Sequence, residues 1–304
     1  MLDLLKRARG YLSGEELSQR LKISRQVLWK HIQELRERGY DIPAVPHLGY
    51  QLVSAPDRLF PFEITHELNT GFIGRKIAYF DTLSSTMEPA MQLGREGCPE
   101  GAIVVAETQT RGKGRFNREW LSPKYKGIYF SLVLRPEVAV NEAAALTLLT
   151  AVSICEAIKE SCALEARIKW PNDILMHHKK LAGILTEISA ETDRVHFVVI
   201  GVGINVNNDK KSLVAAATSL KEQKKEEVSR LHLLQSLLRR IEDNYLDFKN
   251  NSPACILDKW RACNLTLGKR VRVSCGRHEV EGQALDIDSD GGLLIRNDSG
   301  FTEK

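Results

Sequence analysis

The sequence predicts an α+β protein of three consecutive domains: a winged helix-turn-helix, a mixed α/β domain and a small β-barrel. Three observations predict this order. Two amphipathic helices and a two-stranded turn occupy residues 1–57, strands alternate with long helices in residues 58–261, and short alternating strands fill residues 262–304. With 304 residues, 43% of them apolar, the chain is long enough to bury more than one core.

The first domain begins with a short amphipathic helix over residues 15–21, followed by a turn at Lys22 and a second helix. Ser24 is a good N-cap for that second helix, and Gly39 is a natural C-terminal stop. Its apolar residues repeat at helical spacing and are expected on one buried face: Val27, Leu28, Ile32 and Leu35. Two segments, 40–42 and 49–53, flank a turn containing Pro and Gly at 43–48 and predict a wing.

The second helix and its approach carry a local excess of positive charge. Between Arg20 and Arg38 there are six basic residues and two acidic ones, whereas the whole chain has a mild formal charge of +4. DNA affinity would therefore come from this patch, because phosphate contacts need local cations. The residues expected to contact DNA are Ser24, Arg25, Gln26 and Lys30. The alternative is a helix-turn-helix that serves only packing or dimerisation.

The central domain combines period-two strand patterns with three long amphipathic helix patterns, and the linker 54–57 marks its start. The expected strands cover residues 76–80, 102–107, 128–134, 166–170, 183–189 and 195–202, and the expected helices cover 86–95, 142–161 and 231–250. In the last domain, strand patterns at 270–273, 279–284 and 293–295 predict the barrel.

A glycine-rich basic loop, Gln109 to Trp120, follows the strand at 102–107. Its two glycines, Gly112 and Gly114, allow the backbone to approach a ligand closely, and its basic side chains suit phosphate or carboxylate. The loop is therefore a candidate anion cradle. A solvated basic turn is the alternative for this loop taken alone.

Four further features could carry chemistry, and each also has a structural explanation. The hydroxyls of Ser85 and Thr86 precede a helix, where they could cap it or bind a polar ligand. The segment 169–173 places Lys, Asn and Asp around a proline, as a surface turn also could. Lys180 lies in an otherwise apolar strand, where it could act in a site or simply protect a sheet edge. Glycines interrupt the strand that ends at Asn205, but they do not complete a dinucleotide-binding fingerprint.

Taken in this order, the five features closely resemble the motifs of the biotin protein ligases. With a winged helix in front and a small barrel behind, nearly the whole chain resembles the bifunctional ligases that also repress the biotin operon. The resemblance implies a central domain of the class II synthetase-like biotin ligase type and an SH3-like barrel.

The resemblance also implies roles for individual residues. Lys180, Arg115 and Arg118 would be catalytic, and Asp173 would contact Mg²⁺. The residues implied to bind biotin are Ser85, Thr86, Met87, Gln109, Lys113, Gly114, Arg115 and Lys180. Those implied to bind ATP or the adenylate are Arg118, Trp120, Asn172, Asp173 and Asn205.

The implied reaction consumes biotin and ATP with Mg²⁺, forms biotinyl-5′-adenylate and transfers biotin to a lysine of the biotin carboxyl carrier protein of acetyl-CoA carboxylase. The same adenylate would act as corepressor, favouring a homodimer that binds operator DNA. A regulator that binds biotin without ligating it, and a related ligase for lipoate or another acyl acid, are the alternatives.

Three departures from the family's usual pattern stand out. Lys113 replaces an arginine, Asn117 stands where a glycine is expected, and Met87 occupies a position often held by asparagine. The barrel is also expected to lack its last strand. Lysine keeps the charge of arginine but loses its planar two-point contact, so adenylate retention is expected to change.

The remaining composition predicts a cytoplasmic protein without a membrane segment. The start of the chain lacks the apolar segment of a secretory signal, and the apolar runs near 143–152 and 195–204 are too short to cross a bilayer. The six cysteines form no C-x-x-C pair, which argues against a zinc site or a disulfide framework and favours reduced thiols.

Overall fold

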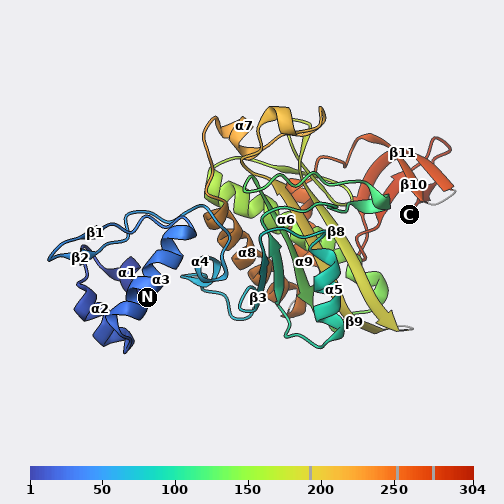
Figure 1. Ribbon diagram of the computed structural model, residues 1–304. Coiled ribbons are helices and arrows are strands. Elements are labelled where there is room, and N and C mark those ends of the chain that lie inside the picture. The colour runs from blue at the N-terminus through green and yellow to red at the C-terminus, as the bar shows by residue number, and fades with distance from the viewer. Residues whose placement is uncertain (192–193, 251–252, 276–277) are drawn as a thin grey trace. The chain divides into compact units, whose positions relative to one another are not determined.

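The chain divides into two compact units, Met1–Asp57 and Arg58–Lys304, in a computed structural model (Figure 1). The structure describes residues 1–304 except 192–193, 251–252 and 276–277.

The first unit contains both predicted helices of the helix-turn-helix. Its elements are α1 (Leu2–Arg7), α2 (Gly14–Leu21), α3 (Arg25–Glu37), β1 (Ala44–Val45) and β2 (Gly49–Tyr50). The N-cap prediction is confirmed, since Ser24 Oγ accepts a hydrogen bond from Val27 N at 3.3 Å. Gly39 follows the helix with φ of +94°, a conformation that glycine adopts without strain.

Two details of the first unit differ from the sequence-based expectation. Val27 is 41% exposed, because the buried face of α3 is formed by Leu28, Ile32 and Leu35 alone. The first strand of the wing is Ala44–Val45 rather than 40–42, and it pairs with β2. Residues 40 and 42 pack inward instead, which buries their side chains in the small core of this unit.

The second unit is built on a seven-stranded mixed sheet in the order β3-β4-β5-β9-β8-β7-β6. Strands β3 and β4 are parallel, and the other neighbours are antiparallel. The strands are β3 (Ile77–Phe80), β4 (Ile103–Ala106), β5 (Gly127–Leu134), β6 (Arg167–Lys169), β7 (Asp173–Met176), β8 (Lys179–Glu191) and β9 (Arg194–Asn205).

Strict alternation along the central strands separates the two faces of the sheet. On β9, Val198, Ile200 and Val202 join the main hydrophobic core, whereas Phe197 and Val199 join a smaller core on the opposite face. The period-two pattern therefore assigns the next residues of the second face, Gly201 and Gly203, to the side away from the main core. The candidate site lies on that side.

Three helices, α6 (Ala144–Cys162), α8 (Arg230–Asn250) and α9 (Pro253–Cys263), contribute to the main core, while α5 (Met87–Arg95) packs on the other face (Figure 1). The helical segment Val140–Cys162, which contains the apolar run near 143–152, is long and apolar enough by length and composition alone to cross a membrane. Of its apolar 18-residue window, 72% is buried within the protein, because the helix packs against the sheet and the other helices.

The C-terminal part forms a four-stranded antiparallel sheet in the order β10-β11-β12-β13. The strands are β10 (Arg270–Cys275), β11 (His278–Ile287), β12 (Leu293–Arg296) and β13 (Thr302–Glu303). Three of them were expected from the sequence. Apolar residues of β11 and β12 join the main core, and Trp170 Nε1 donates to Gly291 O at 3.0 Å. This sheet therefore packs directly behind the turn that precedes β7.

Several short elements complete the second unit. They are α4 (Pro61–Thr65), α7 (Leu220–Lys224) and three 3₁₀ turns, η1 (Arg115–Asn117), η2 (Val140–Ala143) and η3 (Lys210–Ser212). The three predicted long helices and six predicted central strands are all present, with ends shifted by a few residues.

Candidate functional site

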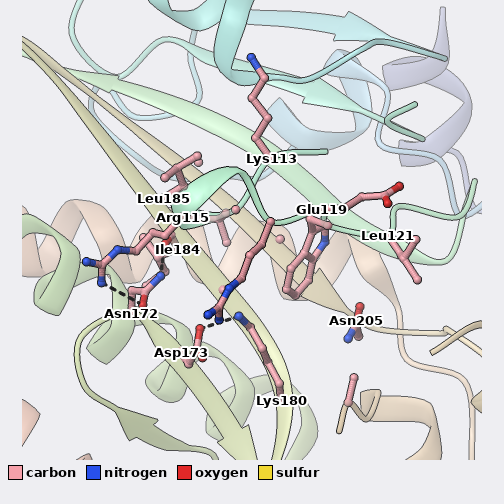
Figure 2. Close-up of a pocket in the computed structure, with 18 of the residues that line it drawn as sticks. Lys113, Arg115, Glu119, Leu121, Asn172, Asp173, Lys180, Ile184, Leu185 and Asn205 are labelled. Carbon is pink, nitrogen blue, oxygen red and sulfur yellow. Dashed lines mark hydrogen bonds and ion pairs between the residues drawn. The ribbon is translucent and has the colours of Figure 1, made fainter. Parts of the chain in front are cut away.

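A cavity of about 350 Å³ opens on the sheet face that carries α5, and its lining comes from segments far apart in the sequence (Figure 2). All thirteen residues for which the sequence suggested a biotin or nucleotide role line this one cavity. They are Ser85, Thr86, Met87, Gln109, Lys113, Gly114, Arg115, Arg118, Trp120, Asn172, Asp173, Lys180 and Asn205.

The floor of the cavity consists of glycines on the two long strands. A Cβ atom added at Gly203 would lie 2.5 Å from Trp120 Nε1, and one added at Gly201 would lie 2.5 Å from Met87 Sδ. Real atoms do not approach so closely, so any side chain here would displace its neighbour. The glycines in this strand thus create room for Trp120 and Met87 to pack over the sheet.

A buried polar cluster forms one end of the cavity. Gln109 Oε1 accepts hydrogen bonds from Thr86 N at 2.8 Å and from Thr86 Oγ1 at 3.2 Å. Ser131, on β5, donates a hydrogen bond from its Oγ to Thr86 Oγ1 at 2.8 Å. Thr86 begins α5 without capping it through its side chain, contrary to one sequence interpretation, whereas Ser85 Oγ accepts from Met87 N at 3.4 Å. These fixed donors and acceptors suit a small polar ring.

The basic loop folds back on itself over the cavity. Trp120 N donates to Gly112 O at 2.9 Å, and Gly114 N donates to Arg118 O at 2.7 Å. Between these pairs, Phe116 and Asn117 have φ values of 56° and 57°. Asparagine tolerates this left-handed conformation better than most residues, which explains how Asn117 can stand where glycine is expected. We call residues 112–120 the lid.

The side chain of Lys113 lies away from the other cations of the site (Figure 2). Its Nζ is 2.7 Å from Glu88 Oε1, and Ser84 Oγ donates to the same carboxylate at 2.9 Å. The hydrogen bond from Lys113, followed by that from Ser84, lowers the pKa of Glu88. The ion pair connects the lid to the first turn of α5.

Two separate sequence motifs meet at the opposite end of the cavity. Lys180 Nζ lies 2.6 Å from Asp173 Oδ1 and 5.5 Å from the ring centre of Trp120 (Figure 2). Both backbone groups of Lys180 are held by the segment at 216–218, which fixes the start of its side chain. Asn172 Nδ2 donates to Ile184 O at 2.7 Å, and its Oδ1 accepts from Arg115 at 3.4 Å.

The cavity has an electropositive lining, with five cationic side chains and two carboxylates. The cations are Lys113, Arg115, Arg118, Lys169 and Lys180, and the carboxylates are Glu119 and Asp173. Such a lining favours anions. Among the described residues no cluster of three or more His, Cys, Asp or Glu side chains could hold a metal ion. Asp173 therefore suits only a metal that takes its other ligands from phosphate and water.

The residues suggested for DNA contact belong to the first unit. Ser24, Arg25, Gln26 and Lys30 are all exposed at or near the start of α3. The guanidinium of Arg25 lies 3.0 Å from a carboxylate oxygen of Glu15 on α2. The exposed surface of α3 thus presents both amide and cationic groups.

Sequence reasoning missed several residues that shape the cavity. The sequence indicates Glu88 as a site residue only weakly, through its position four residues after Ser84 and directly after Met87. Nothing in the sequence indicates Ser131. Leu213 and Val214 reach the cavity from a loop whose position no local pattern indicates. All of these contacts depend on tertiary packing.

Comparisons with known proteins agree across the whole chain. The model of the Biotin/lipoate A/B protein ligase family matches residues 79–205, an HTH domain model matches 1–51, and the Biotin protein ligase C terminal domain matches 266–304. The Bifunctional ligase/repressor BirA of Bacillus subtilis is 40% identical over 295 residues, covering 96% of this chain and 91% of the relative. The BirA of Escherichia coli is 31% identical, with 94% and 88% covered.

A solved structure, the biotin protein ligase from Aquifex aeolicus in complex with biotin and ATP, has a similar fold. The TM-score is 0.65 at 30% sequence identity, and the match covers 75% of this chain and 95% of that one.

Proposed function

The chain belongs to the biotin protein ligases of the bifunctional ligase/repressor kind, and we propose how its residues carry out both activities. It is a biotin ligase that uses ATP and biotin and carries an HTH repressor domain. The acceptor is a lysine of the biotin carboxyl carrier protein. One observation supports the ligase chemistry most directly: a lysine and a carboxylate 2.6 Å apart in an electropositive cavity beside a buried polar cluster.

We assign the polar end of the cavity to biotin. Ser85, Thr86 and Gln109 would hydrogen-bond the ureido ring, because Ser85 and Thr86 are buried and Gln109 is already oriented by its hydrogen bonds. Met87 would pack against the apolar part of the substrate. The backbone of the lid at 113–115 would then lie along the carboxylate side of biotin, with the side chain of Lys113 on Glu88.

We assign the nucleotide to the other end. Arg118 would bind phosphate, Trp120 would form one wall of the nucleotide site, and Asn172 and Asn205 would contact the nucleotide. Trp120 Nε1 is buried against Gly203 and has no hydrogen-bond partner among the described residues, so the indole would meet the nucleotide through its ring carbons. When Mg²⁺ is bound, Asp173 would hold it together with phosphate and water oxygens, and the ion would supply positive charge to the phosphates.

The first reaction joins two anions. The carboxylate of biotin attacks the α-phosphate of ATP, the bond to the β-phosphate breaks, and pyrophosphate leaves with biotinyl-5′-adenylate remaining. Lys180, Arg115 and Arg118 would offset the repulsion between the reactants and stabilise the charge of the transition state. Lys180 would exchange its contact with Asp173 for the substrate, which is a short movement of one flexible side chain.

The second reaction transfers biotin to the acceptor. The neutral amine of the acceptor lysine attacks the acyl carbon, the bond to the phosphate oxygen breaks, and AMP leaves. The lid would exclude water until then, because an acyl adenylate exposed to solvent hydrolyses. No covalent bond to the enzyme is needed in either step.

The repressor activity would use the first unit. Helix α3 and the wing would bind operator DNA, and the adenylate would favour a homodimer whose two-fold symmetry matches the operator. We also propose that the protein acts in the cytoplasm, where both its acceptor and its operator would be found.

The test combines the purified protein with biotin, MgATP and a biotin carboxyl carrier domain, and measures labelled acceptor. Lys180→Ala should lower the rate by about 100- to 1,000-fold, the usual effect of removing a group that stabilises transition-state charge. Lys179→Ala is the matched control, since adjacent strand residues point to opposite faces. An unlabelled acceptor with the wild-type protein would refute the assignment, and labelling by lipoate but not biotin would identify an acyl-acid ligase instead.

A further inference from the structure

One large apolar side chain of α3, the indole of Trp29, lies on the exposed surface of the helix. Trp29 is 57% exposed, whereas Leu28 and Ile32, which belong to the buried stripe of the helix, are 1% and 0% exposed. Gln26 lies three residues before Trp29, so helical spacing places Gln26 beside the indole, and Lys30 is exposed on the adjoining surface of the helix. A large apolar side chain therefore lies among polar groups on the surface that would face DNA.

The only polar atom of the indole is already engaged within the helix. In the amide orientation that satisfies its neighbours, Gln33 Oε1 accepts from Trp29 Nε1 at 3.3 Å and from Arg36 Nη1 at 3.0 Å. Arg36 is fixed in turn, because its Nε donates to Ile42 O at 2.9 Å. This chain of contacts orients the indole and leaves mainly its carbon atoms for an outside partner.

The charge around Trp29 points to duplex DNA as that partner. Six basic residues and two acidic ones lie between Arg20 and Arg38, which suits a polyanion. In the major groove each base pair presents hydrogen-bonding groups, and thymine alone adds a methyl group. Carbon surface on a recognition helix can distinguish base pairs there only through that methyl group.

We propose that Trp29 is a specificity-determining residue that recognises thymine methyl groups in the operator. This inference depends on the proposed DNA-binding function. Gln26 and Lys30 contact hydrogen-bonding groups or phosphates on either side, while the indole excludes water from the thymine methyl.

The experiment first selects duplexes from a random DNA library with the wild-type protein, biotin and MgATP. Each thymine of the selected half-site is then replaced by uracil, which removes only the methyl group. For the wild-type protein, at least one replacement per half-site should weaken binding about fourfold, the effect of exposing one buried methyl-sized group. Trp29→Ala should bind thymine and uracil equally at that position, whereas Trp29→Phe, which keeps an aromatic surface, should retain the preference.

Lys30→Ala is the control for general DNA affinity. It should weaken binding to all duplexes, reduce the salt dependence and keep the preference for thymine. A thymine preference that persists in Trp29→Ala, or that is absent from the wild-type protein, overturns the role of Trp29 while DNA binding stands. If the wild-type protein enriches no duplex, the DNA-binding function fails and the role of Trp29 fails with it. Thermal unfolding followed by circular dichroism checks that each variant is folded.

Discussion

The ion pair between Lys113 and Glu88 leads to the most specific prediction about the lid. Both side chains are partly exposed, at 44% and 54%, and their charged atoms are 2.7 Å apart. Exposed ion pairs contribute about 0.2–1 kcal/mol. If the pair keeps the lid closed over the adenylate, its loss should speed adenylate release by about 1.4- to 5-fold.

The assay measures the release of preformed labelled biotinyl-5′-adenylate after an excess of unlabelled adenylate is added. Lys113→Gln, Glu88→Gln and the double variant should all release it at similar, modestly increased rates, because each removes the same interaction. The difference from the wild-type protein should shrink at high salt, where exposed charges are screened.

The pH dependence has a definite sign. The pKa of Glu88 is lowered in the folded protein, chiefly by the hydrogen bond from Lys113. The pair is therefore fully formed above the ordinary carboxyl pKa and is lost as pH falls through the lowered value. Wild-type release should approach that of the variants only in acid.

A different outcome would refute this role. If Lys113 instead contacts the biotin carboxylate, a charged hydrogen bond of about 1.5–3 kcal/mol would be lost, and release would accelerate more than tenfold. Glu88→Gln would then have no matching effect. That pattern would assign Lys113 to the substrate and leave Glu88 without a role in the lid.

Two further predictions concern groups inside the second unit. Gly203→Ala adds an atom 2.5 Å from Trp120 Nε1, so the indole must move. Overpacking that costs about 1–3 kcal/mol should reduce the rate of adenylate formation by about five- to 150-fold. An unchanged rate of pyrophosphate release would contradict this prediction. Cys263 has a pKa lowered to about 7, chiefly by a hydrogen bond from Cys155. Its alkylation by iodoacetamide should therefore rise with pH around a midpoint near that value, and a midpoint near the ordinary 9.0 would show that the hydrogen bond is absent in solution.

The sequence predicted the central elements well where one face of an element is uniformly apolar. The periodicity of α8 and of the long strands is local information, so their presence needs no knowledge of the fold. The first strand of the wing was harder to predict from the sequence, because Ala44–Val45 has only two residues and lies in a proline-rich segment. Helix α9 was not predicted, since it begins at a proline and its apolar residues join a core built by other elements.

The site was predictable as a set of residues but not as a set of contacts. The order of the motifs identified thirteen of the residues that line the cavity, including Lys180 and Asp173, but not Leu213 or Val214. Nothing local indicates that these two side chains meet at 2.6 Å, because β7 and β8 must pair first. The partner of Lys113 was equally hidden, since Glu88 lies on a helix that reaches the lid only through packing of α5 on the sheet.

Two residues of the lid, Asn117 and Lys113, depart from the usual pattern of the family. The first preserves the backbone path of the lid, and the second changes the side-chain chemistry. Asn117 has φ of 57°, a conformation that glycine adopts freely and asparagine tolerates, so the lid keeps the backbone path that a glycine would allow. Lysine at position 113 changes the chemistry, because a flexible ammonium can reach Glu88 but cannot make the two-point contact of a guanidinium. Altered retention of the adenylate should therefore arise from the side chain of Lys113, and restoring arginine there should affect release more than restoring glycine at 117.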